Sequence, residues 1–115
     1  MLRARASRRL LKRKTKVDSG ASVTIRDGRI VVSGPLTFQT VPPLVSQAST
    51  WLQQDDSEFT VDLSGVSRAD SAGVALLLEW WQTLHAAQRR LTYTGVPGQV
   101  ETFIRINGLD STLLK

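Results

Sequence analysis

The sequence predicts an α/β fold, a single domain with a mixed four-stranded β-sheet and α-helices packed mainly on one face. Strand and helix signals follow one another along the chain in the order ββαβαβα. Short connections between a strand, a helix and the next strand favour parallel pairing through right-handed crossovers. With 115 residues and 41% apolar content, the chain can bury one core and has no room for a second domain of ordinary size.

The first two strands are predicted at residues 22–25 and 29–33. Both runs are rich in β-branched residues, and Arg26-Asp27-Gly28 lies between them. An Asp-Gly step between two such runs is a strong hairpin signal. We therefore expect an antiparallel hairpin whose second strand ends at Gly34-Pro35.

A helix starting at Thr40 and a central strand are predicted next. Thr40 suits the N-cap, because Pro42-Pro43 then falls in the first turn. Polar residues 53–57 close this helix, and a strand at 58–63 precedes a loop at 64–70. Apolar residues recur at helical spacing at Leu44, Ala48, Trp51 and Leu52.

A long helix from Ser71 to about Gln88, a strand at 91–94 and a shorter helix complete the predicted domain. Gly108 is well placed to cap the shorter helix, and residues 109–115 are expected to add one more turn. Four residues are predicted to share one face of the shorter helix: Val100, Phe103, Ile104 and Asn107.

The positive charge is concentrated in residues 1–16. Eight of the fifteen Lys and Arg residues precede Val17, whereas residues 17–115 carry 7 basic and 10 acidic groups, a net charge of −3. The sequence pI near 10.5 therefore describes this arm and gives no evidence that the domain at 17–115 binds nucleic acid. We expect a flexible basic arm. The alternatives are contact with anionic lipid, nucleic acid or an acidic protein, an upstream extension from a misplaced start codon, and an organelle presequence.

The composition also argues against several classes of function. The chain has no cysteine, so it has no disulfide framework or thiolate metal cluster, which fits a reducing cytoplasm. Its longest apolar stretch, 72–78, is far shorter than the roughly 20 residues of a membrane-spanning helix. A single histidine, His85, and the lack of a phosphate loop or nucleophile elbow leave no catalytic or metal constellation. We expect a cytoplasmic domain that is not an enzyme and has no cofactor or metal.

Asp70-Ser71 opens the long helix and is the leading candidate for function. Ser71 suits an N-cap or first-turn position, and an acidic Asp70 suits the positive end of the helix dipole. On these residues alone, a purely structural capping role is favoured over a functional one.

A helical wheel divides the long helix into two faces. The side expected to pack on the sheet comprises Val74, Leu77, Leu78, Trp81 and Leu84. The opposite side comprises Ala72, Leu76, Glu79, Thr83 and Ala86. Because that side has few charges and an apolar Leu76, we interpret it as a docking surface, with a merely solvated face as the alternative. Trp51 is expected in the core, Trp80 at an interface boundary, and His85 in a structural role.

The stretch D-L-S-G-V-S-R-A-D-S-A-G-V-A-L-L-L at 62–78 resembles the signature of the STAS domain family, named for sulphate transporters and anti-sigma factor antagonists. The resemblance covers about residues 22–114, including V-S-G-P-L-T-F-Q-T-V-P at 32–42 and N-G-L-D at 107–110. It implies a small sheet with helices on one side and regulation by docking. In anti-sigma factor antagonists, the residue that matches Ser71 is phosphorylated by a partner kinase.

Within the family, the sequence is most similar to the STAS subunit of the Gram-negative phospholipid ABC transporter that maintains outer-membrane lipid asymmetry. Ser67–Asp70 is polar where anti-sigma factor antagonists usually carry a bulky apolar pair, and A-L-L-L-E-W-W at 75–81 resembles the helix of the transporter branch. A serine at 71, where many chains of this branch have threonine, leaves the phosphorylation branch open.

This resemblance implies a non-catalytic regulatory subunit that binds the cytoplasmic ATPase, in a complex with permease and substrate-binding subunits peripheral to the inner membrane. The alternative is an anti-sigma factor antagonist regulated by phosphorylation of Ser71. Under either function, the expected partner-binding residues are Asp70, Ser71, Ala72, Leu76, Glu79 and Thr83.

Overall fold

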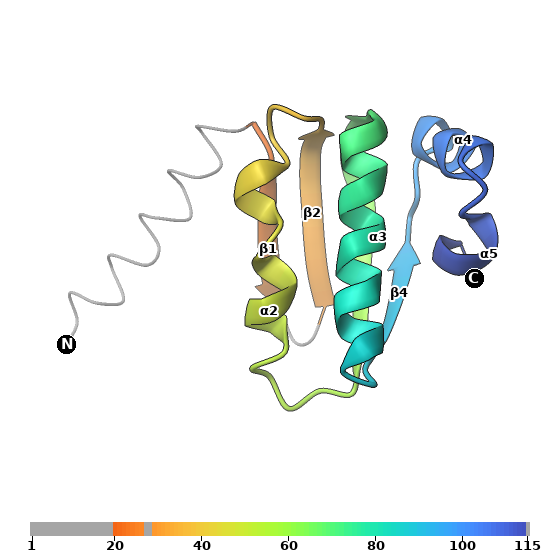
Figure 1. Ribbon diagram of the computed structural model, residues 1–115. Coiled ribbons are helices and arrows are strands. Elements are labelled where there is room, and N and C mark those ends of the chain that lie inside the picture. The colour runs from red at the N-terminus through yellow and green to blue at the C-terminus, as the bar shows by residue number, and fades with distance from the viewer. Residues whose placement is uncertain (1–19, 27–28, 115) are drawn as a thin grey trace, which may run out of the picture.

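The protein forms one mixed sheet covered by helices (Figure 1). The computed structural model describes residues 20–26 and 29–114. The strands lie side by side in chain order, with the first pair antiparallel and the other two pairs parallel. They are β1 (Ser22–Arg26), β2 (Arg29–Leu36), β3 (Glu58–Ala69) and β4 (Arg90–Thr94). The predicted fold class is confirmed.

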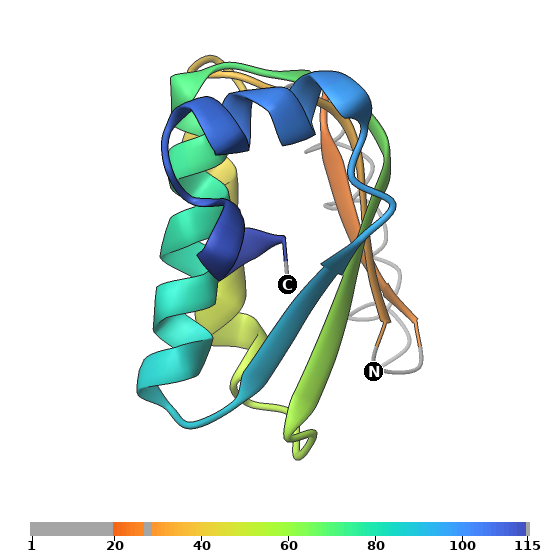
Figure 2. The same cartoon turned by 90° about the vertical axis from the view of Figure 1, so that its right-hand side faces the viewer.

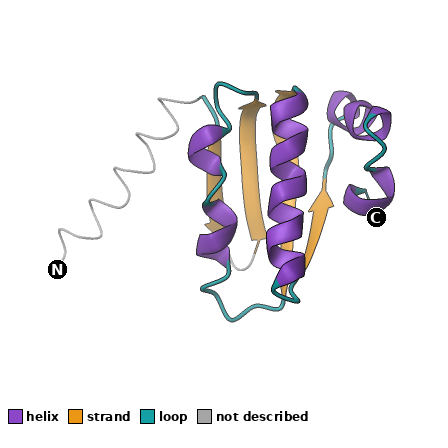
Figure 3. Cartoon of the chain, in the orientation of Figure 1, coloured by secondary structure: helices purple, strands orange, loops and turns teal. Residues whose placement is uncertain are grey.

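All described helices lie on the same side of the sheet (Figures 2 and 3). The longest, α3, runs along the middle of this layer with α2 beside it, and α4 and α5 lie beyond β4 (Figure 1). The helices are η1 (Pro42–Leu44), α2 (Gln47–Trp51), α3 (Ser71–Ala86), α4 (Gly98–Ile106) and α5 (Asp110–Leu113). No helix in the described ranges is long and apolar enough to cross a membrane.

The β1–β2 hairpin is confirmed by its pairing, which runs from Ser22 opposite Ser33 to Arg26 opposite Arg29. The turn residues Asp27 and Gly28, like the basic arm at 1–16, lie outside the described residues.

The central strands are longer than the sequence predicts. The expected loop at 64–70 is wrong, because β3 continues to Ala69 and pairs with an extended β2 up to Leu36. Gly34-Pro35 does not end β2, since the sheet accommodates it at a register irregularity between Gly34 and Leu36. Gly34 has φ +90, and a Cβ there would collide with the backbone of Gly20.

The first predicted helix is broken into η1 and the short α2, and its start is wrong. Thr40 does not cap a helix. Its hydroxyl closes the preceding turn, accepting from the Thr37 backbone N–H at 2.9 Å and donating to the Pro35 carbonyl at 2.7 Å. The side-chain hydrogen bond therefore stabilises a loop where the pattern indicates a helix start.

The α4 region agrees with the sequence prediction. Val100 and Ile104 are buried, and Gly108 adopts φ +71 just beyond the helix. The Leu109 backbone N–H donates to the Ile104 carbonyl at 3.1 Å, which closes the helix end in the manner of a Schellman motif. The expected extra turn is α5.

Candidate partner-docking site

Asp70 organises the N-terminus of α3. One carboxylate oxygen accepts hydrogen bonds from the backbone N–H groups of Ala72 (2.9 Å) and Gly73 (3.2 Å). The other accepts from the Phe38 backbone N–H at 3.1 Å, which joins the 37–40 loop to the helix. Partial burial by itself raises the pKa of Asp70, but the backbone hydrogen bonds outweigh it and hold the pKa below its ordinary value.

Asp70 is the N-cap of α3, and Ser71 is the first residue of the helix. Of the two positions predicted for Ser71, N-cap or first turn, the first turn is therefore correct. The Ser71 side chain is exposed. Its hydroxyl has no hydrogen-bond partner among the described residues. Since Ser71 is not needed as a cap, its hydroxyl is available to a partner or a kinase.

The close packing of α3 on the end of β2 fixes the position of Ser71. A Cβ at Gly73 would lie 2.2 Å from the Leu36 carbonyl oxygen, a distance that real Cβ atoms do not reach. The Asp70 backbone N–H also donates to this carbonyl, at 3.2 Å. The lack of a side chain at Gly73 therefore lets the first turn of α3 sit directly against the sheet.

Phe38 is a candidate site residue that the sequence analysis missed. Its side chain is 72% exposed, although its backbone is bound to Asp70. A large exposed aromatic side chain held by an ordered loop is typical of a docking surface. The available signal is one apolar residue within the otherwise polar 37–40 segment.

The outward face of α3 differs from the predicted one. Ala75 and Glu79 are exposed on this face. Ala72 and Thr83 are partly buried and lie at its sides. Glu79 is therefore on the outward face as predicted, and Ala72 and Thr83 are beside it. The placement of Leu76 is wrong, since this residue is only 2% exposed. We call Phe38, Ser71, Ala75 and Glu79 the Ser71 surface.

The core side of α3 is correspondingly rotated toward α2. Trp80, expected at an interface boundary, is fully buried and packs edge-on against Trp51 of α2, with ring centroids 4.9 Å apart. Its indole N–H donates to the Leu44 carbonyl at 3.1 Å. Val74, Leu77 and Leu84 are buried as expected, whereas Leu78 and Trp81 are only partly buried.

No group of three or more potential metal ligands comes together in the described part of the chain. His85 is exposed and stacks on Trp81, with ring centroids 4.5 Å apart. The site offers an exposed hydroxyl, an exposed aromatic ring and the two carboxylates of Asp70 and Glu79. Such a surface can bind another protein.

A protein-family model described as "Mlab, STAS domain" matches residues 19–115. The chain belongs to the STAS domain family. In this domain, the family signature at 62–78 covers the second half of β3, the Asp70 cap and the first half of α3. No curated protein matches the sequence.

Solved structures similar to this STAS domain include those of two anti-sigma factor antagonists. One, from Mycobacterium paratuberculosis, has a TM-score of 0.65 and 24% identity over 81% of this chain and 80% of its own. The antagonist SpoIIAA in its unphosphorylated form has a TM-score of 0.65 and 18% identity over 81% and 84% of the two chains. The phosphorylated form of SpoIIAA, from Bacillus, has a TM-score of 0.60 and 20% identity over 81% and 87%. At these identities the likeness shows a shared fold.

Proposed function

We propose that this STAS domain is a non-catalytic regulatory subunit of a phospholipid ABC transporter and binds the transporter's cytoplasmic ATPase through the Ser71 surface. The observation that carries the proposal is the match of residues 19–115 to the family model described as "Mlab, STAS domain". By its resemblance to the MlaB branch, the partner is an MlaF-like ATPase. The complex includes permease and substrate-binding subunits, and it holds the domain peripherally at the inner membrane.

The geometry at the start of α3 supports docking there. Phe38 offers an exposed aromatic ring, and its backbone N–H donates to the carboxylate of Asp70, the residue before Ser71. Ala75 and Glu79 continue this surface along α3 at successive helical turns. Glu79 is the one charged side chain among Phe38, Ser71 and Ala75, and few charges lower the cost of desolvating a protein interface.

The alternative function is an anti-sigma factor antagonist switched by phosphorylation of Ser71. It is supported by the exposed, unpartnered hydroxyl of Ser71 and by the fold shared with SpoIIAA, whose structures include phosphorylated and unphosphorylated forms. A phosphate on Ser71 would gain from the helix dipole but would be repelled by the Asp70 carboxylate. Modification would therefore change both the charge and the hydrogen bonds of the site.

The two functions are separated by co-expressing the full chain with the phospholipid transporter ATPase of its own organism. We expect the two proteins to co-purify, and we expect Ser71→Asp to weaken binding at least about tenfold because it places a charge in the contact. Ser49→Asp is the matched control, since Ser49 is an exposed serine on α2.

A lack of binding to the ATPase, with phosphate found on Ser71 of the chain purified from its own cells, would overturn the transporter proposal in favour of the antagonist. Equal ATPase binding by wild type and Ser71→Asp would remove Ser71 from the interface.

A further inference from the structure

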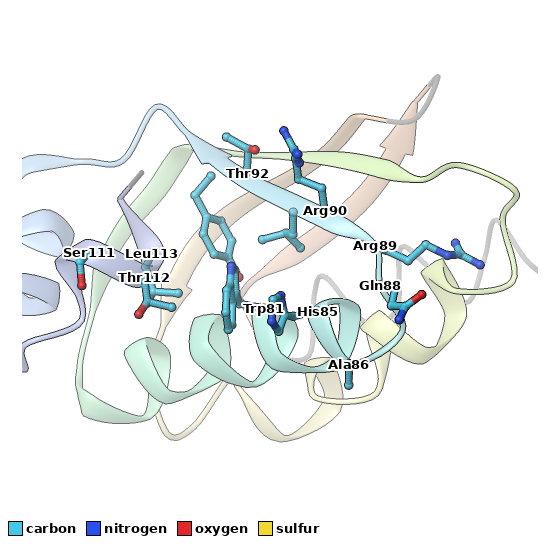
Figure 4. A pocket seen from close by; sticks show the side chains of 12 residues that line it. Trp81, His85, Ala86, Gln88, Arg89, Arg90, Thr92, Ser111, Thr112 and Leu113 are labelled. Carbon is cyan, nitrogen blue, oxygen red and sulfur yellow. The ribbon is translucent and has the colours of Figure 1, made fainter.

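A groove lies between the free edge of β4, the C-terminal half of α3 and α5 (Figure 4). Its volume is about 1150 Å³. Small-molecule pockets usually measure about 300–1,000 Å³, so this groove is somewhat larger than such a pocket. We call it the β4 groove.

One edge of β4 pairs with β3, and the other edge, which faces the groove, is unpaired in the described part of the chain. The Arg90 N–H donates to the Ser57 carbonyl at 2.8 Å, so the backbone groups of Arg90 are directed toward β3. Because these directions alternate along a parallel strand, the N–H and C=O groups of Leu91 and Tyr93 point to the open edge. Within 20–26 and 29–114, no strand pairs with that edge. Exposed groups of this kind are a template for another strand.

The walls of the β4 groove are ordered and combine apolar with polar side chains. Trp81 and His85 stack nearly in parallel, with an interplanar angle of 12°. The Tyr93 hydroxyl donates to the Leu77 carbonyl at 2.7 Å, which fixes the ring between strand and helix. Leu113 of α5 contributes a further apolar side chain (Figure 4). A preformed wall reduces the entropic cost of binding.

The charges around the β4 groove are basic. None of the residues that line it is acidic. The Arg89 guanidinium is engaged with the carbonyls of Gln54 (3.2 Å) and Asp56 (2.8 Å). Arg90 is exposed and forms no ion pair with a described residue, so it can pair with an acidic side chain of a ligand.

We propose that the β4 groove binds an extended segment of a partner protein, which pairs with Leu91 and Tyr93 as an added strand and carries an acidic side chain to Arg90. Main-chain pairing supplies affinity in this mode. Alternate side chains of the segment contact the apolar lining residues, such as Trp81 and Leu113. A single extended chain fits better than the edge of a second folded domain, because α4 and α5 lie beyond β4 on the side of approach (Figure 1). The β4 groove is separate from the Ser71 surface.

The test is to pan a phage-displayed library of random peptides, about twelve residues long, against the full chain. We expect enriched peptides that alternate apolar and polar residues and contain an acidic residue. Each corresponding synthetic peptide should slow amide hydrogen exchange at Leu91 and Tyr93. Arg90→Glu should weaken its binding about tenfold or more, whereas Ser71→Asp should leave it unchanged.

Thr112→Trp, which narrows the groove, should also block these peptides, and Thr112→Ser is its matched control. Thermal melting of each variant shows whether a loss of binding reflects unfolding, and the wild-type exchange measurement does not depend on either variant. The proposal is overturned if no such peptide is enriched, or if the enriched peptides leave exchange at Leu91 and Tyr93 unchanged.

Discussion

Asp70 shows how one side chain can hold a docking site together. Its carboxylate caps α3 and also holds the loop that carries Phe38. Asp70 and Ser71 are predictable from their position before an apolar helical run. Phe38 is not, because the hydrogen bond that joins its loop to the helix links residues 32 positions apart.

Replacing Asp70 should reduce stability in a pH-dependent way. Asp70→Ala is expected to lower the free energy of unfolding by about 0.5–2 kcal/mol through loss of the cap. The native pKa of Asp70 is lowered, so the carboxylate's charge-dependent contribution is fully present above the unfolded pKa of about 3.9. It is lost as the pH falls through the native pKa.

Denaturant unfolding of wild type and Asp70→Asn at about pH 7 and about pH 3 checks this sign. Asp62, whose pKa is also lowered, is present in both proteins and provides a common background. Wild type should lose more stability than Asp70→Asn between the two pH values. An equal loss would show that the Asp70 charge does not stabilise the fold.

Phe38→Ala should weaken partner binding without affecting folding. Phe38 is highly exposed, so its removal is expected to change the free energy of unfolding by no more than about 0.5 kcal/mol. As an aromatic anchor, it should contribute about 2 kcal/mol or more to binding of the ATPase. Titration calorimetry measures this loss. Ile106→Ala is the matched control, because Ile106 on α4 is equally exposed, at 72%, and Ile106→Ala should bind normally.

At the level of elements, α3 shows why a helical wheel alone assigns faces incompletely. The two faces of the wheel account for packing on the sheet only. In the structure, α2 covers a second flank of α3, so Leu76 and Trp80 are buried together with Trp51. The contact between Trp51 and Trp80 depends on where α2 lies, and α2 follows the turn closed by Thr40 and the separate helix η1. The local periodicity of α3 contains no signal for this placement.

Leu76→Ala should therefore behave as a core substitution. We expect it to cost about 2–5 kcal/mol of stability through the cavity that it leaves. Ala75→Arg, one position earlier on the exposed face, should fold normally and should weaken docking on the Ser71 surface. Thermal melting and co-purification of both variants test the assignment. A Leu76→Ala protein as stable as wild type would contradict the rotated face.

Just beyond the C-terminal end of α3, the backbone of Gln88 is strained, and a substitution can relieve this strain. Gln88 has φ 62, a left-handed conformation that favours glycine, and it is followed by an Arg89 N–H bonded to the Leu84 carbonyl at 2.8 Å. Gln88→Gly is expected to stabilise the protein by up to about 1 kcal/mol. Ala87→Gly, at φ −92, should instead destabilise it by about 0.5–1 kcal/mol. Denaturant midpoints of the two variants should move in opposite directions.

At the scale of the whole molecule, the order of elements and the one-sided helical layer were predictable, because each long segment has a clear periodicity. The parallel pairing also follows from the strand, helix, strand order. The true ends of β2 and β3 did not follow, since Gly34-Pro35 and Gly65 are turn signals that the paired sheet accommodates. The β4 groove was equally inaccessible, because it depends on where α5 lies relative to the edge of the sheet.

The parallel pairing of β2 with β3 has a consequence for how the chain folds. The β1–β2 hairpin is local and can form within about 1–10 μs, whereas β2–β3 pairing must first close the whole segment that contains η1 and α2. Closing such a loop has an entropic cost before any contact compensates for it, so this step is slower. Phe38 lies just after β2, at the start of that segment, and Asp70 follows the end of β3. The Ser71 surface is therefore assembled only when the slow step is complete, and a partner that requires both Phe38 and Ser71 distinguishes folded chains from nascent ones.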